Sequence, residues 1–204
     1  MMNNLTNTAK KLDKILEIAY IVLGALAVAA AVFIILIGLA YVMDWDPSFI
    51  GTGYSSFDVG FLELEFAPGY GPDPWLVLGH GAFTLIVSAL LLLDGRRGIG
   101  YIREILQPMT EEKPFDSSAS MNLKKLAKLS IRIGVLWNIM MLSEMIVMVF
   151  VYELPGLLLS EKISHIGGTF QVDLSFLVCW AILTLLSYVF QYGQQLQQLS
   201  DETL

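Results

Sequence analysis

The sequence predicts an all-α integral membrane protein with four transmembrane helices, a small extracytoplasmic β cap and an amphipathic cytoplasmic loop. Three observations lead to this fold class. The 204 residues are 55% hydrophobic and only 15% charged, and their mean hydropathy is +0.65. A soluble domain of this size needs more charge to cover its surface. The apolar residues also collect in four long runs, and the basic residues collect between particular runs.

The four apolar runs are long enough to be spans, because roughly 20 apolar residues cross about 30 Å of hydrocarbon. We expect one membrane domain that comprises the whole chain, residues 1–204. Its spans are predicted at residues 18–43, 75–93, 133–151 and 174–190. The first run is longer than the apolar core of a secretory signal and further spans follow it, so we interpret it as a retained anchor.

The distribution of basic residues predicts the orientation. Three lysines precede the first span, and eight basic residues lie in the loop formed by residues 94–132. The two other loops, residues 44–74 and 152–173, hold only Lys162. Because basic loops stay on the cytoplasmic side of a plasma membrane, both termini and the loop 94–132 are expected in the cytoplasm.

The outer loops contain signals for strands. Residues 61–66 alternate between apolar and acidic side chains, which is typical of a half-buried strand. Residues 163–166 and 169–172 bracket Gly167-Gly168, a pattern that predicts a hairpin turn. We therefore expect a β cap over the outer ends of the helices.

The loop 94–132 contains a basic amphipathic segment. Ile99, Ile102 and Ile105 recur at helical spacing beside arginines, so the segment is expected to lie at the inner membrane interface. Pro108 and Pro114 are expected to break it, and Asp116 or Ser117 then offers a helix N-cap. The surface is suited to anionic lipid or to a cytoplasmic protein.

Two ionisable residues lie inside the predicted spans. His80 and Glu144 are at similar depth, so we predict that they contact each other, directly or through one water. Asn138 lies deeper and is expected to extend this polar seam. The seam is interpreted either as a structural hydrogen bond or as a ligand or proton site.

No pattern in the chain predicts catalysis, so we do not expect an enzyme. Nucleophile arrangements, phosphate-binding loops and zinc motifs are absent from the sequence. The single cysteine, Cys179, excludes an intramolecular disulfide. We expect no metal, no cofactor and no direct contact with nucleic acid.

Two segments resemble a bacterial membrane-protein family catalogued as domain of unknown function 2975. Lys113-Pro114-Phe115-Asp116 and the following residues 122–126 look like that family's "kG-PF" motif and leucine-arginine helix, although Glu112-Lys113 replaces the usual glycine-containing lead. Residues 192–204 look like its C-terminal "G-x-x-Leu-Gln … Ser-Asp-Glu-Thr" signature. The resemblance implies a bacterial cytoplasmic membrane and, by association only, a small helix-turn-helix regulator as partner.

Two functional hypotheses follow. The first is a sensory or regulatory membrane protein that binds, and sequesters, a cytoplasmic helix-turn-helix regulator. Its partner-binding residues would come from the middle loop and the tail: Lys124, Lys125, Lys128, Leu196, Leu199, Asp201 and Glu202. The second is a small transporter or immunity-type protein that uses the His80/Glu144 seam. Besides the lipid bilayer, a second copy of the chain is compatible with either hypothesis.

Overall fold

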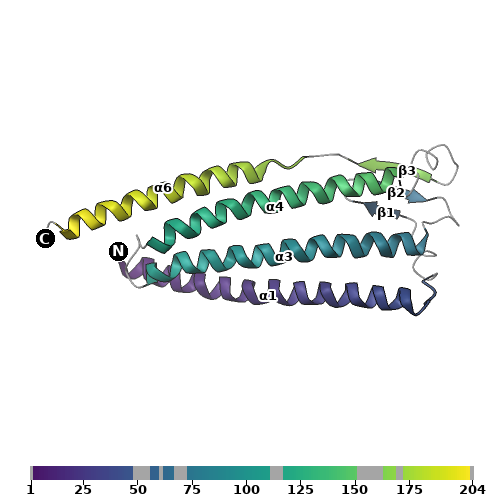
Figure 1. Cartoon of the computed structure of the whole chain (residues 1–204), viewed down its shortest axis with the longest axis horizontal. Coiled ribbons are helices and arrows are strands. Elements are labelled where there is room, and N and C mark those ends of the chain that lie inside the picture. Colours follow the sequence, from purple (N-terminus) through teal and green to yellow (C-terminus); the bar gives the residue numbers. More distant parts are fainter. Residues whose placement is uncertain are drawn as a thin grey trace. The chain divides into compact units, whose positions relative to one another are not determined.

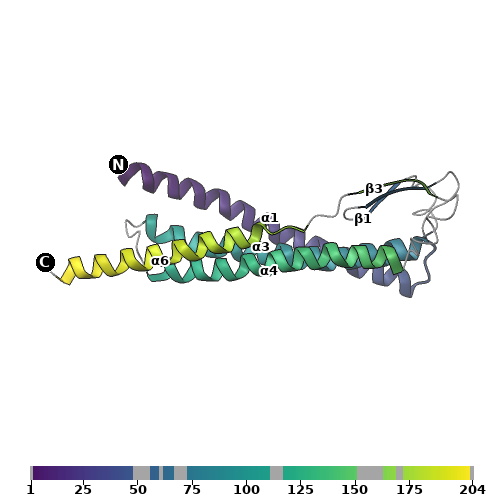
Figure 2. The same ribbon diagram turned by 90° about the horizontal axis from the view of Figure 1, so that it is seen from above.

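The protein is described here from a computed structural model (Figure 1). The structure describes residues 2–47, 56–59, 62–66, 73–110, 117–150, 163–168 and 172–202. Four long helices dominate these residues: α1 (Met2–Val42), α3 (Pro74–Thr110), α4 (Ser117–Phe150) and α6 (Ser175–Glu202). Figure 2 shows the same helices as uninterrupted ribbons in a second view.

Each of the four helices is long and apolar enough to cross a membrane. The shortest, α6, has 28 residues. At 1.5 Å per residue it is about 42 Å long, which exceeds the roughly 30 Å of a bilayer's hydrocarbon core. The predicted class of multi-pass, helical membrane protein is therefore confirmed.

Local chemistry explains two of the helix ends. Asp73 precedes α3, and its Oδ1 accepts hydrogen bonds from the backbone N–H groups of Trp75 at 2.8 Å and Leu76 at 3.4 Å. Pro74 at the first helical position has no N–H to satisfy, so Asp73-Pro74 is a strong start signal. At the end of α1, Asp44 adopts a positive φ of 53°, and the Trp45 N–H donates to the Ala40 carbonyl at 3.0 Å. This left-handed residue closes the helix.

The prediction that residues 94–110 belong to a loop and that Pro108 breaks the segment was wrong, whereas the predicted place of this segment at the membrane interface stays a prediction. The helix α3 continues without interruption to Thr110, and Pro108 lies inside its last turn. The apolar stripe is used for helix packing: Ile105 of α3 is buried with Ala119 and Leu123 of α4, and Leu183 of α6 packs against them. This packing buries Ile105 between helices, whereas Ile102 of the same stripe is 37% exposed. Residues 111–116, which include Pro114 and Asp116, lie outside the described part of the chain.

Three strands form a separate antiparallel sheet in the order β1-β2-β3: β1 (Ser56–Val59), β2 (Leu62–Phe66) and β3 (Ile163–Gly168). The strand β2 occupies the segment whose alternation predicts a strand. The hairpin turn predicted at Gly167-Gly168 was wrong, because both glycines belong to β3 and pair with Glu63 and Leu62 of β2. The long-range pairing with β2 therefore replaces the local turn.

The chain divides into two compact units. The first, which we call the basic unit, comprises Met1–Ala27, Leu90–Val135 and Leu174–Leu204. It contains every lysine and arginine of the chain except Lys162. The second, the sheet unit, comprises Val28–Ala89 and Leu136–Asp173.

Candidate functional site

A buried carboxylate belongs to the basic unit. The side chain of Asp94 in α3 is only 1% exposed. Arg97 Nη1, one turn further along α3, donates a hydrogen bond to Asp94 Oδ1 at 2.8 Å. Arg132 Nε of α4 lies 2.8 Å from Asp94 Oδ2. This second contact has the distance of an ion pair but lacks the alignment of a hydrogen bond.

These three residues, which we call the charged cluster, connect α3 to α4. A buried carboxylate without a partner is strongly unfavourable, so both arginines offset the desolvation of Asp94. The side chains of Arg97 and Arg132 are 57% and 54% exposed, respectively. Each guanidinium group therefore touches the buried acid on one side and is open on the other.

A second set of contacts joins α1 to α3. Arg103 Nε donates a hydrogen bond to Asp13 Oδ1 at 2.8 Å, and its Nη2 lies 3.8 Å from Glu17 Oε2. Arg96 precedes Arg103 on α3, and Tyr20 follows Glu17 on α1. The Arg96 guanidinium carbon lies 4.2 Å from the centre of the Tyr20 ring, which is a cation–π contact. These side chains are partly exposed, so solvent screens both ion pairs and each stabilises the fold only weakly. Together they fix which faces of α1 and α3 meet.

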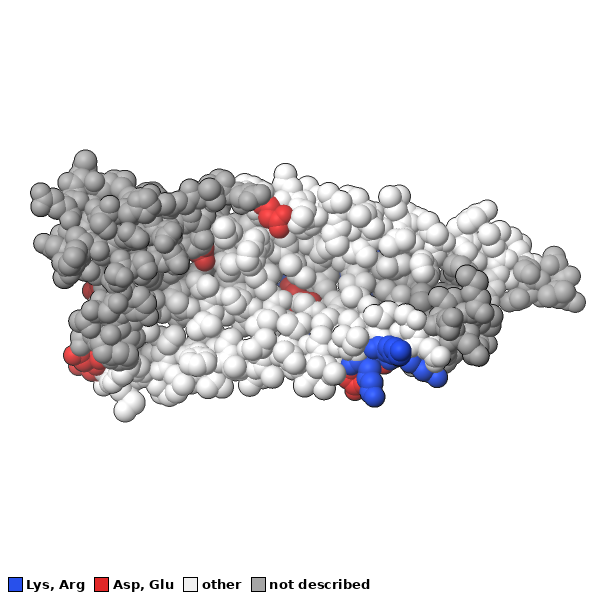
Figure 3. Space-filling model, turned by 180° about the vertical axis from the view of Figure 1, so that it is seen from behind, with Lys and Arg blue, Asp and Glu red and all other residues white. Residues whose placement is uncertain are grey.

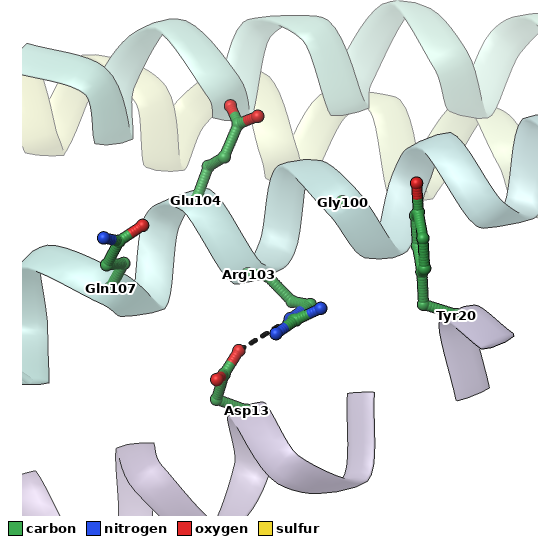
Figure 4. Close-up of a pocket in the computed structure, with 6 residues that line it drawn as sticks. All are labelled: Asp13, Tyr20, Gly100, Arg103, Glu104 and Gln107. Atoms are coloured by element: carbon green, nitrogen blue, oxygen red, sulfur yellow. Dashed lines mark hydrogen bonds and ion pairs between the residues drawn. The ribbon is translucent and has the colours of Figure 1, made fainter. Parts of the chain in front are cut away.

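An open polar pocket of about 570 Å³ lies beside these contacts (Figure 4). In Figure 4 the Arg103 side chain points toward Asp13, whereas the Glu104 side chain extends away from it. A smaller pocket of about 240 Å³ shares Glu104 and Gln107 with the first. The larger pocket is lined by Asp13, Tyr20, Gly100, Arg103, Glu104 and Gln107, and the smaller by Glu104, Gln107, Pro108, Ser118, Met121 and Asn122. Carboxylate, guanidinium and amide groups thus share one accessible surface.

The surface in Figure 3 agrees with this distribution of charge. Lysine and arginine side chains gather in a blue patch with red acidic side chains beside it, and most of the other described surface is white. Among the residues that the structure describes, no group of three or more His, Cys, Asp or Glu side chains is placed to hold a metal ion.

The intramembrane residues predicted from sequence belong to the sheet unit. Glu144 of α4 is 5% exposed, and its Oε2 accepts no hydrogen bond from a described residue. His80 lies in the first turns of α3 and is half-buried. The contact between His80 and Glu144 stays a prediction.

Asn138 has a defined role at the start of α6. Its Nδ2 donates a hydrogen bond to the carbonyl oxygen of Asp173 at 2.9 Å, and its Oδ1 accepts one from the Asp173 backbone N–H at 3.2 Å. The side-chain amide therefore holds the backbone that precedes α6, a use that the predicted polar seam did not include.

Two of the three predicted partner-binding lysines contact neighbouring helices. Lys124 Nζ lies 3.5 Å from Gln191 Oε1 of α6. Lys125 Nζ donates to the buried Asn122 at 3.2 Å and lies 5.3 Å from the centre of the Tyr101 ring of α3. Lys128 is exposed. The first two lysines therefore support the packing of α3, α4 and α6.

The predicted partner-binding residues of the tail are exposed where they are described. Leu196 and Leu199 of α6 are 49% and 59% exposed, and Glu202 is also exposed. The side chain of Asp201 lies outside the described residues.

Sequence reasoning missed the charged cluster, because Asp94 and Arg132 were assigned to the two ends of a loop. A signal was present nonetheless. Asp94 directly follows one apolar run, Arg97 is three residues further on, and Arg132 directly precedes the next run. In an antiparallel pair of helices, these positions fall at the same level.

No family model, curated protein or solved structure matches this chain. The resemblance to domain of unknown function 2975 accordingly stays an expectation.

Proposed function

We propose that the protein is a membrane-bound regulatory partner that docks, and thereby sequesters, a small cytoplasmic helix-turn-helix regulator. The polar pocket of the basic unit is the observation that carries this proposal. Glu104 presents an exposed carboxylate there, Asp13 adds one that also pairs with Arg103, and DNA-binding proteins present clustered basic side chains. Occupying those basic side chains would compete with DNA for the same surface of the regulator.

The proposed orientation puts the basic unit in the cytoplasm of a bacterium. The positive-inside rule supports it, because all basic residues except Lys162 belong to that unit. In this orientation both termini are cytoplasmic, and the three-stranded sheet is proposed as a cap on the outer side. The exposed Leu196 and Leu199 then extend the docking surface along the end of α6.

The docking proposal is tested with the full-length protein in lipid nanodiscs and the helix-turn-helix protein encoded nearest to its gene. Glu104→Lys reverses a charge on the pocket wall, and we expect it to slow association about tenfold, most strongly at low salt. Truncation after Gln194 removes Leu196 and Leu199 and is expected to weaken binding further. Surface plasmon resonance measures both effects.

Lys11→Glu serves as the control, because Lys11 is exposed on α1 and does not line the pocket. It changes the net charge of the basic unit as much as Glu104→Lys does but with the opposite sign, and it should not slow association. The docking proposal is wrong if the wild-type protein binds no regulator. It is also wrong if Glu104→Lys and the truncation after Gln194 bind the regulator as the wild-type protein does.

The second candidate function is a small transporter or immunity-type protein. The burial of Glu144 favours it, because an ionisable group inside a span is costly unless it serves a function or finds a partner. This alternative predicts no cytoplasmic regulator, so the same binding experiment separates the two.

A further inference from the structure

We propose that Arg97 and Arg132, held in place by Asp94, form a binding site for the phosphate group of an anionic phospholipid. This site is independent of the docking function, since neither arginine lines the polar pocket. The charged cluster holds both guanidinium groups around one buried acid.

The chemistry of the cluster fits an anion. A guanidinium group carries five N–H donors in a planar fork that suits phosphate. Asp94 uses Nη1 of Arg97 and Nε of Arg132, and the other nitrogens of both groups form no ion pair with a described residue. More than half of each side chain is exposed. The cluster therefore has one carboxylate for two arginines, which leaves a net positive charge on an accessible surface.

Exposed apolar side chains lead directly to both arginines. On α3, Leu90 and Leu93 are 40% and 39% exposed and lie seven and four residues before Arg97, on the same helix face. On α4, Val135 is 44% exposed and follows Arg132 by three residues. Exposed apolar side chains thus precede Arg97 on α3, and one follows Arg132 on α4, as expected where acyl chains give way to headgroups.

The position of the cluster selects a lipid over a free anion. Asp94 and Arg132 lie where two apolar runs end, so the arginines are at the level of the lipid phosphates. Lys128, one turn from Arg132 on α4, is exposed and adds positive charge on that side. A phospholipid can contact the arginines with its phosphate and the leucines with its acyl chains, whereas inorganic phosphate uses only the arginines.

The experiment measures lipid binding to the purified full-length protein in detergent by native mass spectrometry. We expect phosphatidylglycerol to bind about tenfold more tightly than phosphatidylcholine. The double variant Arg97→Lys/Arg132→Lys keeps both charges but loses the planar forks, and we expect it to lose about tenfold in affinity for phosphatidylglycerol. Diffuse electrostatic attraction predicts that the double lysine variant keeps its affinity for phosphatidylglycerol. That result would contradict the proposed site.

Arg103→Lys is the matched control, because it makes the same substitution on α3 at an arginine that pairs with Asp13 instead. It should leave the affinity for phosphatidylglycerol unchanged. If the lysine variant fails to fold, the variant Asp94→Asn/Arg132→Gln takes its place. It removes one acid and one base together, so the net charge of the cluster does not change. Retained phosphatidylglycerol binding in this variant would also overturn the proposal.

Competition with inorganic phosphate distinguishes the two sources of the anion. We expect inorganic phosphate to displace phosphatidylglycerol only at far higher concentration, because it makes no apolar contact. Equal competition on a molar basis would contradict a lipid site and identify a site for a free anion.

Discussion

Replacing both Arg97 and Arg132 by alanine is expected to destabilise the protein by about 3 kcal/mol. The reason is the burial of Asp94, whose side chain is 1% exposed and pairs with these two arginines. Removing both partners leaves a buried charge uncompensated, which costs about 3–5 kcal/mol, and we take the lower end because both arginines are half exposed. Unfolding of the detergent-solubilised protein by urea, followed by circular dichroism, measures the change.

Asp94→Asn supplies the control for this prediction. Added to the two alanine substitutions, it removes the buried charge, so the triple variant should be more stable than the double variant. A double variant as stable as the wild-type protein would show that the charged cluster does not stabilise the fold. A triple variant less stable than the double variant would show that the carboxylate charge is not what the arginines offset.

Gly134→Ala is expected to have the next largest effect, a loss of about 1–3 kcal/mol. Gly134 is buried on α4, and a Cβ atom at this position would overlap the Phe176 side chain of α6. The overlapping atoms include the Cβ of Phe176. Because the overlap involves the base of the Phe176 side chain, a change of rotamer cannot relieve it. The two helices must move apart, which also loses the contacts around Gly134. The same urea unfolding experiment measures this loss.

Gly38→Ala is the matched control, because nothing lies within 4 Å of a Cβ at Gly38 of α1. There the higher helix propensity of alanine should leave the stability unchanged or raise it by about 0.5–1 kcal/mol. Phe176→Ala removes the overlapping ring atoms but keeps the Cβ of residue 176, so in the Gly134→Ala background it should relieve only part of the overlap. Equal stability of Gly134→Ala and Gly38→Ala would contradict the close approach of α4 and α6.

The spans were predictable because their signal is local. A run of apolar residues is visible in composition alone, and residues 18–43 fall within α1 apart from Met43, which follows its last residue. The ends of the helices were not predictable in the same way. Hydropathy drops at Asp94, yet α3 continues to Thr110, because Ile105 packs against α4 and Arg103 pairs with α1. These contacts join residues far apart in the sequence.

The difference between local signals and long-range contacts also explains which polar residues could be predicted from the sequence. His80 and Glu144 were conspicuous because each interrupts an apolar run. Asp94 was not, since an acid beside arginines at the end of a span is typical of a solvated loop. Only the contact of Arg132 on α4 with Asp94 distinguishes a buried cluster from surface charge. Likewise, alternation predicted a strand where β2 lies, whereas its pairing with β3 depends on a segment about 100 residues away.

The central claim, that four spans leave the basic unit in the cytoplasm, is tested most directly by cysteine labelling in intact cells. In a Cys179→Ser background, single cysteines replace Ser56, Ser164, Ser118 or Ser200. We predict that a membrane-impermeant thiol reagent labels Ser56→Cys and Ser164→Cys from outside and labels Ser118→Cys and Ser200→Cys only after the cells are broken. Labelling of Ser118→Cys in intact cells would contradict this topology.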